Sequence, residues 1–257
     1  MIPREDIIAW SVDHPWPELD QVEQDLLLSQ AICEISNDAV LGRELSLRGG
    51  TALHKLFMKE PFRYSEDLDY VRSTSGGIGK IIDLLKFHGE KLGFRVTTKI
   101  SKYPKVYWKY TAISGIPSKI KIEINTFERS PVFGYFHIEH VVDSAYYAGS
   151  ANVQTFRCEE LVATKIRALY QRSKGRDLYD IWLALSQLGV SPEKVLSAFP
   201  AYRPEQMTMK NCINNLHEKL EDNQFTADIT SLIRRDTPEY DVQNAGVYIE
   251  KVLLSKL

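Results

Sequence analysis

The 257-residue sequence lacks the features that mark disulfide-rich, zinc-binding or membrane-spanning proteins. Its three cysteines, Cys33, Cys158 and Cys212, are far apart and form no CxxC pair, so neither a disulfide framework nor a zinc site is indicated. No run approaches about 20 uninterrupted apolar residues, and charged residues precede the first apolar run, so neither a membrane span nor a signal peptide is expected. We therefore expect a cytoplasmic protein with no membrane partner.

An excess of charge of one sign is also lacking. The 32 basic and 34 acidic residues leave a formal charge of −2, so composition alone gives no reason to expect a nucleic-acid partner. Hydrophobic residues make up 44% and charged residues 26% of the chain, which is ordinary for a globular protein. The length allows one large domain or two modest ones.

Hydrophobic periodicity divides the chain into two halves. The first 20 residues predict an irregular arm, and Asp20 with Glu23 predicts a capping box at the start of a helix over 21–39. Strands are expected over 44–48, 67–72, 106–113, 119–127 and 134–142, and helices over 51–58 and 78–92. After residue 155 only helices are expected, over 159–171, 177–188, 192–199, 204–220 and further pieces. We predict an α+β fold, with a mixed-sheet domain and its N-terminal arm over 1–155 and an all-helical domain over 156–257.

The segment LRGGTAL joins a predicted strand to a predicted helix. Gly49 and Gly50 allow the backbone to approach a phosphate, and the free N–H groups at the helix start, from Thr51 on, favour an anion. Arg63 and Ser65 lie between this turn and the next strand. We expect these five residues to bind the phosphates of a nucleotide; the alternative is an ordinary tight turn.

Two carboxylates follow at strand spacing. Asp67 and Asp69 point to the same face of their predicted strand, about 6–7 Å apart at the backbone. At an effective dielectric near 20, two like charges about 6 Å apart repel by roughly 3 kcal/mol, so a cation is expected. Oxygen ligands beside substrate phosphates suit Mg²⁺, or Mn²⁺ in its place. Glu123, on the polar face of the 119–127 strand, would complete a three-carboxylate site. The alternatives are solvated strand faces.

Two charged residues of the helical half lie on apolar faces. Lys165 falls within the apolar stripe of its helix, which is costly unless its amine meets an anion or reaches solvent. Asp177 shares a helix face with leucine and isoleucine residues; its alternative role is a helix N-cap. Together they predict a lid over the carboxylate site, with Lys165 facing a triphosphate.

At these residues the sequence resembles a known family. The runs GGTALHKLF, RYSEDLDY and LVATKIRALYQRSKGRDLYDI are similar to those of the AbiEii/AbiGii-type, MenT-like nucleotidyltransferase toxins of type IV toxin–antitoxin and abortive-infection systems. The resemblance covers most of the chain. It implies a polymerase-beta-like nucleotidyltransferase fold with a helical C-terminal domain, an NTP substrate, Mg²⁺, and a cognate antitoxin. The family's functional positions match Gly49, Gly50, Asp67, Asp69, Lys165 and Asp177, and Asp180 closes the last of these motifs.

The resemblance also implies an acceptor. Some relatives add pyrimidine nucleotides to the 3′ end of tRNA, so we expect transfer of NMP to tRNA, with translation blocked as the result. Two other functions stay open at this point. One is nucleotide transfer to a protein hydroxyl or a small molecule. The other is a catalytically silent module that binds nucleotide or RNA.

One stretch carries unbalanced positive charge. From Arg95 to Lys121 there are seven basic residues, no acidic residue, and several interleaved aromatic residues. Such a surface tracks a phosphate backbone and stacks unpaired bases, so we expect it to contact RNA. The alternative is that its lysines protect an edge strand from pairing with another chain.

Overall fold

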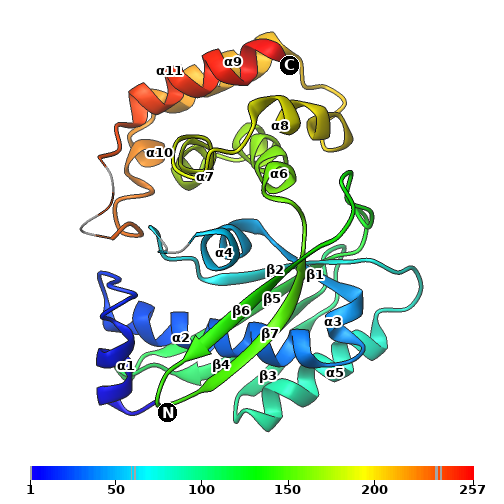
Figure 1. Cartoon of the computed structure of the whole chain (residues 1–257), viewed down its shortest axis with the longest axis vertical. Helices are drawn as coiled ribbons and strands as arrows, with labels where there is room; N and C mark the ends of the chain where they lie inside the picture. Colours follow the sequence, from blue (N-terminus) through cyan, green and yellow to red (C-terminus); the bar gives the residue numbers. More distant parts are fainter. Residues whose placement is uncertain (1, 59, 61, 235–236, 238) are drawn as a thin grey trace. The chain divides into compact units, whose positions relative to one another are not determined.

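The structure is a computed structural model that describes residues 2–58, 60, 62–234, 237 and 239–257. The chain divides into two compact units, Met1–Phe156 and Arg157–Leu257 (Figure 1). The first combines a sheet with helices and the second is helical, which confirms the predicted α+β class. Among the residues described, no helix is long and apolar enough to cross a membrane.

A seven-stranded sheet forms the centre of the first unit, in the order β3-β4-β5-β2-β1-β7-β6. The strands are β1 (Leu45–Arg48), β2 (Asp67–Arg72), β3 (Arg95–Lys99), β4 (Lys105–Thr111), β5 (Pro117–Asn125), β6 (Phe136–Asp143) and β7 (Ala148–Thr155). Strand β2 runs antiparallel to β1 and parallel to β5, so the sheet is mixed. The sequence analysis missed β7, because its first residues, AGSAN, are small and polar and show little apolar alternation. Full pairing with β6 defines β7 as a strand.

The helices of this unit are α1 (Arg4–Trp10), α2 (Leu19–Asn37), α3 (Leu41–Glu44), α4 (Gly49–Ala52), the π-helix η1 (Leu53–Phe57) and α5 (Gly79–Lys91). Figure 1 shows α2 and α5 on one side of the sheet and α4 on the other. The prediction of an irregular arm was wrong for 4–10: acidic residues in the first turn favour a helix, and Ile7 is fully buried. The capping box of α2 is formed by Glu18 and Gln21 rather than by the predicted pair.

Alternation along the central strands separates the core from the polar face. Leu68, Tyr70, Ile120 and Ile122 are buried, whereas their neighbours Asp67, Asp69, Lys121 and Glu123 are only half-buried. Because successive side chains of a strand point to opposite faces, the charged residues of β2 and β5 share one face of the sheet. The apolar face fixes the register that brings them together.

The second unit consists of α6 (Cys158–Gln171), α7 (Gly175–Ser186), α8 (Pro192–Ala198), α9 (Met209–Leu220), α10 (Asn223–Ala227) and α11 (Val242–Val252), with the 3₁₀ turns η2 (Phe199–Ala201) and η3 (Leu254–Lys256). The helix predicted over 204–220 begins only at Met209. The reason is a capping box between Thr208 and Asn211, which satisfies the free N–H groups at that point.

Candidate active site

The turn after β1 requires glycine. Gly49 has φ +78°, a backbone conformation that side-chain-bearing residues rarely adopt. A Cβ atom at this position would lie 2.7 Å from Oδ2 of Asp69, so the main chain passes directly against that carboxylate. The helix starts at Gly49, two residues earlier than predicted, and the helical path continues without interruption through η1 to Phe57. The turn therefore places a helix start beside a carboxylate of β2.

The residues predicted to bind phosphates surround this turn. A Cβ at Gly50 would collide with the guanidinium group of Arg63 and lie 3.1 Å from Oγ of Ser65. Arg63 is buried, and its Nη1 donates a 2.8 Å hydrogen bond to the carbonyl oxygen of the next residue. The buried Thr51 hydroxyl lies 2.9 Å from Oγ of Ser65 and 2.5 Å from the carbonyl oxygen of Asp67. Thr51 and Ser65 thus tie the turn to β2.

Four charged side chains meet where β2 pairs with β5. Asp67 is the register partner of Lys121, and Asp69 that of Glu123. Nζ of Lys121 lies 2.7 Å from Oδ2 of Asp67 and 3.7 Å from Oε2 of Glu123. The structure therefore brings both predicted aspartates to one face of β2, and Lys121 on the neighbouring strand β5 reaches Asp67.

The electrostatics of this group are unbalanced. Burial and the negative charge of Asp67 raise the pKa of Asp69. Burial alone would lower the pKa of Lys121, but its hydrogen bond to Asp67 and the surrounding carboxylates raise it. Lys121 is thus a charged counter-ion that compensates the negative charge of the carboxylates only in part. Burial, together with this uncompensated charge, is what raises the pKa of Asp69.

Glu123 has basic partners of its own. Its carboxylate lies 3.2 Å from Nζ of Lys105 and also contacts Lys121. Within the described part of the chain, no group of three His, Cys, Asp or Glu side chains is arranged to hold a metal ion. The pair Asp67 and Asp69 remains as an all-oxygen donor set, of the kind that holds Mg²⁺ together with substrate phosphates. The raised pKa of Asp69 indicates that the negative charge of the pair is not fully compensated by the surrounding side chains.

The sequence analysis assigned Lys121 to the basic stretch but missed it as a partner of the carboxylates, and it missed Arg48. Lys121 lies two residues before Glu123 on the same polar face, so the alternation that selected Glu123 also pointed to it. Arg48 is the N-cap residue of α4, and its Nη1 lies 2.5 Å from Oε2 of Glu128. No local pattern links Arg48 to Glu128, because 80 residues separate them.

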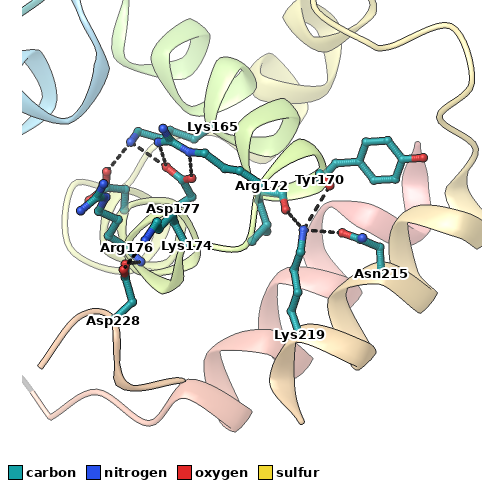
Figure 2. A network of polar contacts seen from close by, with 11 residues as sticks. Lys165, Tyr170, Arg172, Lys174, Arg176, Asp177, Asn215, Lys219 and Asp228 are labelled. Carbon is teal, nitrogen blue, oxygen red and sulfur yellow. Dashed lines mark hydrogen bonds and ion pairs between the residues drawn. The ribbon is translucent and has the colours of Figure 1, made fainter. Parts of the chain in front are cut away.

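The second unit holds a buried ion-pair network (Figure 2). Nζ of Lys165 lies 3.0 Å from Oδ1 of Asp177 and 2.8 Å from Oδ2 of Asp180, and both carboxylates are fully buried. Arg172 donates two hydrogen bonds to Asp177, from Nε at 2.7 Å and from Nη2 at 2.9 Å. Burial alone would raise the pKa of Asp177, but Lys165 and Arg172 hold it below its ordinary value.

The carboxylates of Asp177 and Asp180 are the anions that a lysine on an apolar helix face, such as Lys165, was expected to meet. The structure places its buried amine between two protein carboxylates, and Asp177 is the third residue of α7 rather than its N-cap, which is Lys174. Sequence reasoning missed Arg172 as a partner, although it stands only five residues before Asp177. That Lys165 also meets a triphosphate stays a prediction.

Comparison with known proteins decides the family. The sequence model of the AbiEii nucleotidyl transferase toxins of type IV toxin–antitoxin systems matches residues 32–245, most of the chain. The chain belongs to this family. It is therefore a nucleotidyltransferase, and the AbiEii family implies an NTP substrate and an antitoxin partner. Search of the curated proteins gave no match.

One solved structure shares the fold of this chain. MenT4, a nucleotidyltransferase toxin from Mycobacterium tuberculosis H37Rv, superimposes with a TM-score of 0.66 at 16% identity, over 100% of this chain and 91% of MenT4. This likeness shows the fold. An antigenic nucleotidyltransferase-like protein from Paracoccidioides brasiliensis matches with a TM-score of 0.41 at 15% identity, over 80% of this chain and 94% of that protein.

Proposed function

We propose that this AbiEii-family protein transfers a nucleoside monophosphate from an NTP to the 3′-terminal hydroxyl of a tRNA, and that this modification blocks translation. One observation carries the proposal. The Gly49 backbone lies against the Asp69 carboxylate, with Asp67 on the same face of β2. A phosphate-accepting turn and a carboxylate pair thus occupy one place, which nucleotide transfer requires and a plain structural turn does not.

The residues of the turn act on the triphosphate. The backbone N–H groups at Gly49 and Gly50 would donate hydrogen bonds to the phosphates, and Arg63 and Ser65 pack against the turn at Gly50. Thr51 acts as a positioning residue, because its hydroxyl holds the helix start to the Asp67 carbonyl oxygen. A fixed turn of this kind spares the site the entropy cost of ordering donors around the substrate.

The carboxylates act on the cation. Asp67 and Asp69 would hold Mg²⁺ or Mn²⁺, and the metal would neutralise charge on the triphosphate. Lys121 neutralises part of the negative charge of Asp67, whose Oδ2 lies 2.7 Å from the lysine amine. The acceptor hydroxyl attacks the α-phosphorus and releases its proton to water; the bond between the α-phosphorus and the α,β-bridging oxygen breaks, and pyrophosphate leaves with that oxygen. Such a transfer depends mainly on positioning and on charge neutralisation.

The buried network of the helical unit has a proposed role too. Lys165 supplies positive charge for the triphosphate, and Asp177 and Asp180 orient its amine. The two carboxylates hold the long Lys165 side chain in one rotamer before the triphosphate binds. Less conformational entropy of that side chain is then lost on binding. Their contacts support a positioning role for both.

The test is incubation of the purified protein with labelled NTPs, Mg²⁺ and total tRNA. We expect label on the tRNA 3′ end, identified by mass spectrometry of the terminal fragments, and no label with Asp67→Ala. Asp83→Ala is the matched control, because this aspartate is exposed on α5, with 74% of its side chain accessible. Absence of label on any RNA, or label unaffected by Asp67→Ala, would overturn the proposal. Label on protein instead of RNA would reassign the acceptor.

A further inference from the structure

A basic groove opens beside the carboxylates, on the same face of the sheet. Its volume is about 900 Å³, and Asp67 and Lys121 line one part of it. Arg95, Lys109 and Lys119 line another part, on β3, β4 and β5. The groove therefore continues from the candidate active site across three strands.

The three basic residues form one cross-strand row. Arg95 is the register partner of Lys109, and Lys109 is the register partner of Lys119. Like charges directly opposite one another destabilise a sheet. In the ranges that the structure describes, no carboxylate forms an ion pair with any of the three, whereas Lys105 and Lys121 each have an acidic partner.

Protection of an edge strand does not explain this row. Strand β3 is the edge of the sheet, so Arg95 is suited to that purpose. Lys109 and Lys119, however, lie on β4 and β5, which have hydrogen-bonded neighbours on both sides. Repulsion between basic side chains inside a paired sheet strengthens the binding of an anionic ligand, because the ligand relieves that repulsion.

An aromatic side chain lies next to the row. Tyr107 is the register partner of Lys121, two residues from Lys109 on the same face, and Nζ of Lys119 lies 5.4 Å from the centre of its ring. Grooves that combine cationic and aromatic side chains follow the backbone of single-stranded nucleic acids and stack their bases. The chemistry fits a polynucleotide better than a single small anion, because the charges are spread along a row.

We propose that Arg95, Lys109 and Lys119 bind the phosphate backbone of the single-stranded 3′ segment of the acceptor RNA. The groove then guides the terminal hydroxyl toward Asp67 and Asp69. This inference rests on the proposed function, since it assigns the acceptor side of the same site. It gives the row a role in RNA affinity and none in binding of the NTP.

The test measures binding of a fluorescently labelled oligouridylate by anisotropy over a series of salt concentrations. Lys109→Ala/Lys119→Ala removes two predicted phosphate contacts, so the slope of log K against log salt falls in magnitude by about 1.4. The matched control is Lys80→Ala/Lys86→Ala on α5, a helix that packs on the opposite face through the hydrogen bond from Trp108 to the Leu85 carbonyl oxygen. This control keeps the wild-type slope.

A second measurement separates this proposal from the proposed function. A fluorescent NTP analogue binds the groove variant with wild-type affinity, which also shows that the variant is folded. An unchanged salt slope in the groove variant, or an equal fall in the α5 control, overturns the groove even if nucleotide transfer to tRNA is observed. If no RNA is ever labelled but the slope falls as expected, the groove stands and the transferase proposal fails.

Discussion

Replacement of Asp69 by asparagine gives the sharpest test of the electrostatics at the carboxylate pair. Asp69 follows Asp67 at strand spacing on one face, and its pKa is raised by burial and by the charge of Asp67. At an effective dielectric near 20, the repulsion over about 6 Å amounts to roughly 3 kcal/mol. Lys121, 2.7 Å from Asp67, offsets part of it. We therefore expect Asp69→Asn to raise the free energy of unfolding of the metal-free protein by about 1–2 kcal/mol.

The pH dependence of this gain follows from linkage. Because the pKa of Asp69 is higher in the folded state, the folded protein holds this proton more tightly than the unfolded chain. The free energy of unfolding therefore falls as the pH rises from the ordinary aspartate value of 3.8 through the raised pKa. The asparagine variant does not show this fall in the free energy of unfolding, because asparagine has no proton to release. The gain is therefore present at pH 7.5 and disappears as the pH approaches 4.

The assay is thermal unfolding with EDTA between pH 4 and 8, where each kcal/mol corresponds to about 2–4 °C in Tm. Asp83→Asn, an exposed aspartate of α5, is the control and shifts Tm by less than about 2 °C at every pH. Addition of Mg²⁺ raises the Tm of the wild type more than that of Asp69→Asn, because only the wild type keeps both of the proposed carboxylate ligands. A variant that is less stable than the wild type at pH 7.5, or equally stabilised at pH 4, refutes the reasoning.

Three further outcomes are expected. Gly49→Ala introduces backbone strain and a clash with the Asp69 carboxylate, so we expect it to lower the free energy of unfolding by about 2–4 kcal/mol and to abolish nucleotide transfer. The control is Gly115→Ala, where φ is +84° but the surrounding space is open. We expect this control to lower the free energy of unfolding by only about 1–2 kcal/mol in urea titrations. Lys165→Met leaves two buried carboxylates with less positive charge and costs about 3–5 kcal/mol, measured in the same titrations. The pKa of Asp177 is lowered, so its stabilising contribution is present above pH 4 and is lost at lower pH; Asp177→Asn removes this acid sensitivity in thermal melts.

Local patterns predicted most of the elements that carry the site. Strand 67–72 was predicted with the bounds of β2, because its apolar residues alternate cleanly and turn residues flank it. Gly49 and Gly50 were predicted at the junction of strand and helix, where the structure has them. The family assignment from the GG, DxD and Lys–Asp segments was confirmed by the match over residues 32–245.

What escaped prediction depends on pairs that are distant in sequence. Strand β7 exists through its pairing with β6 and β1, since its own residues carry little β signal. The ion pair of Lys121 with Asp67 needs β2 to pair with β5, and hydrophobic alternation shows which face of each strand is buried but not which strands are neighbours. The contact of Glu123 with Lys105 also depends on pairing between distant strands, β5 and β4, and the role of Glu123 in a three-carboxylate site stays a prediction.

The near-zero charge of the chain hides an ordered separation of charge across one sheet face. Along β5, Glu123 contacts lysines and Lys121 contacts carboxylates. The register partner of Lys119 on β4 is another cation, Lys109. Within four residues the strand thus changes from an acidic end, suited to a metal and a triphosphate, to a basic end, suited to a phosphate backbone. With RNA as the acceptor that we propose, the enzyme must hold two polyanions close enough to react although they repel each other. On this sheet face the carboxylates repel one another and the basic row repels itself. The divalent cation that accompanies an NTP would relieve the first repulsion, and a phosphate backbone would relieve the second, so both contribute to binding.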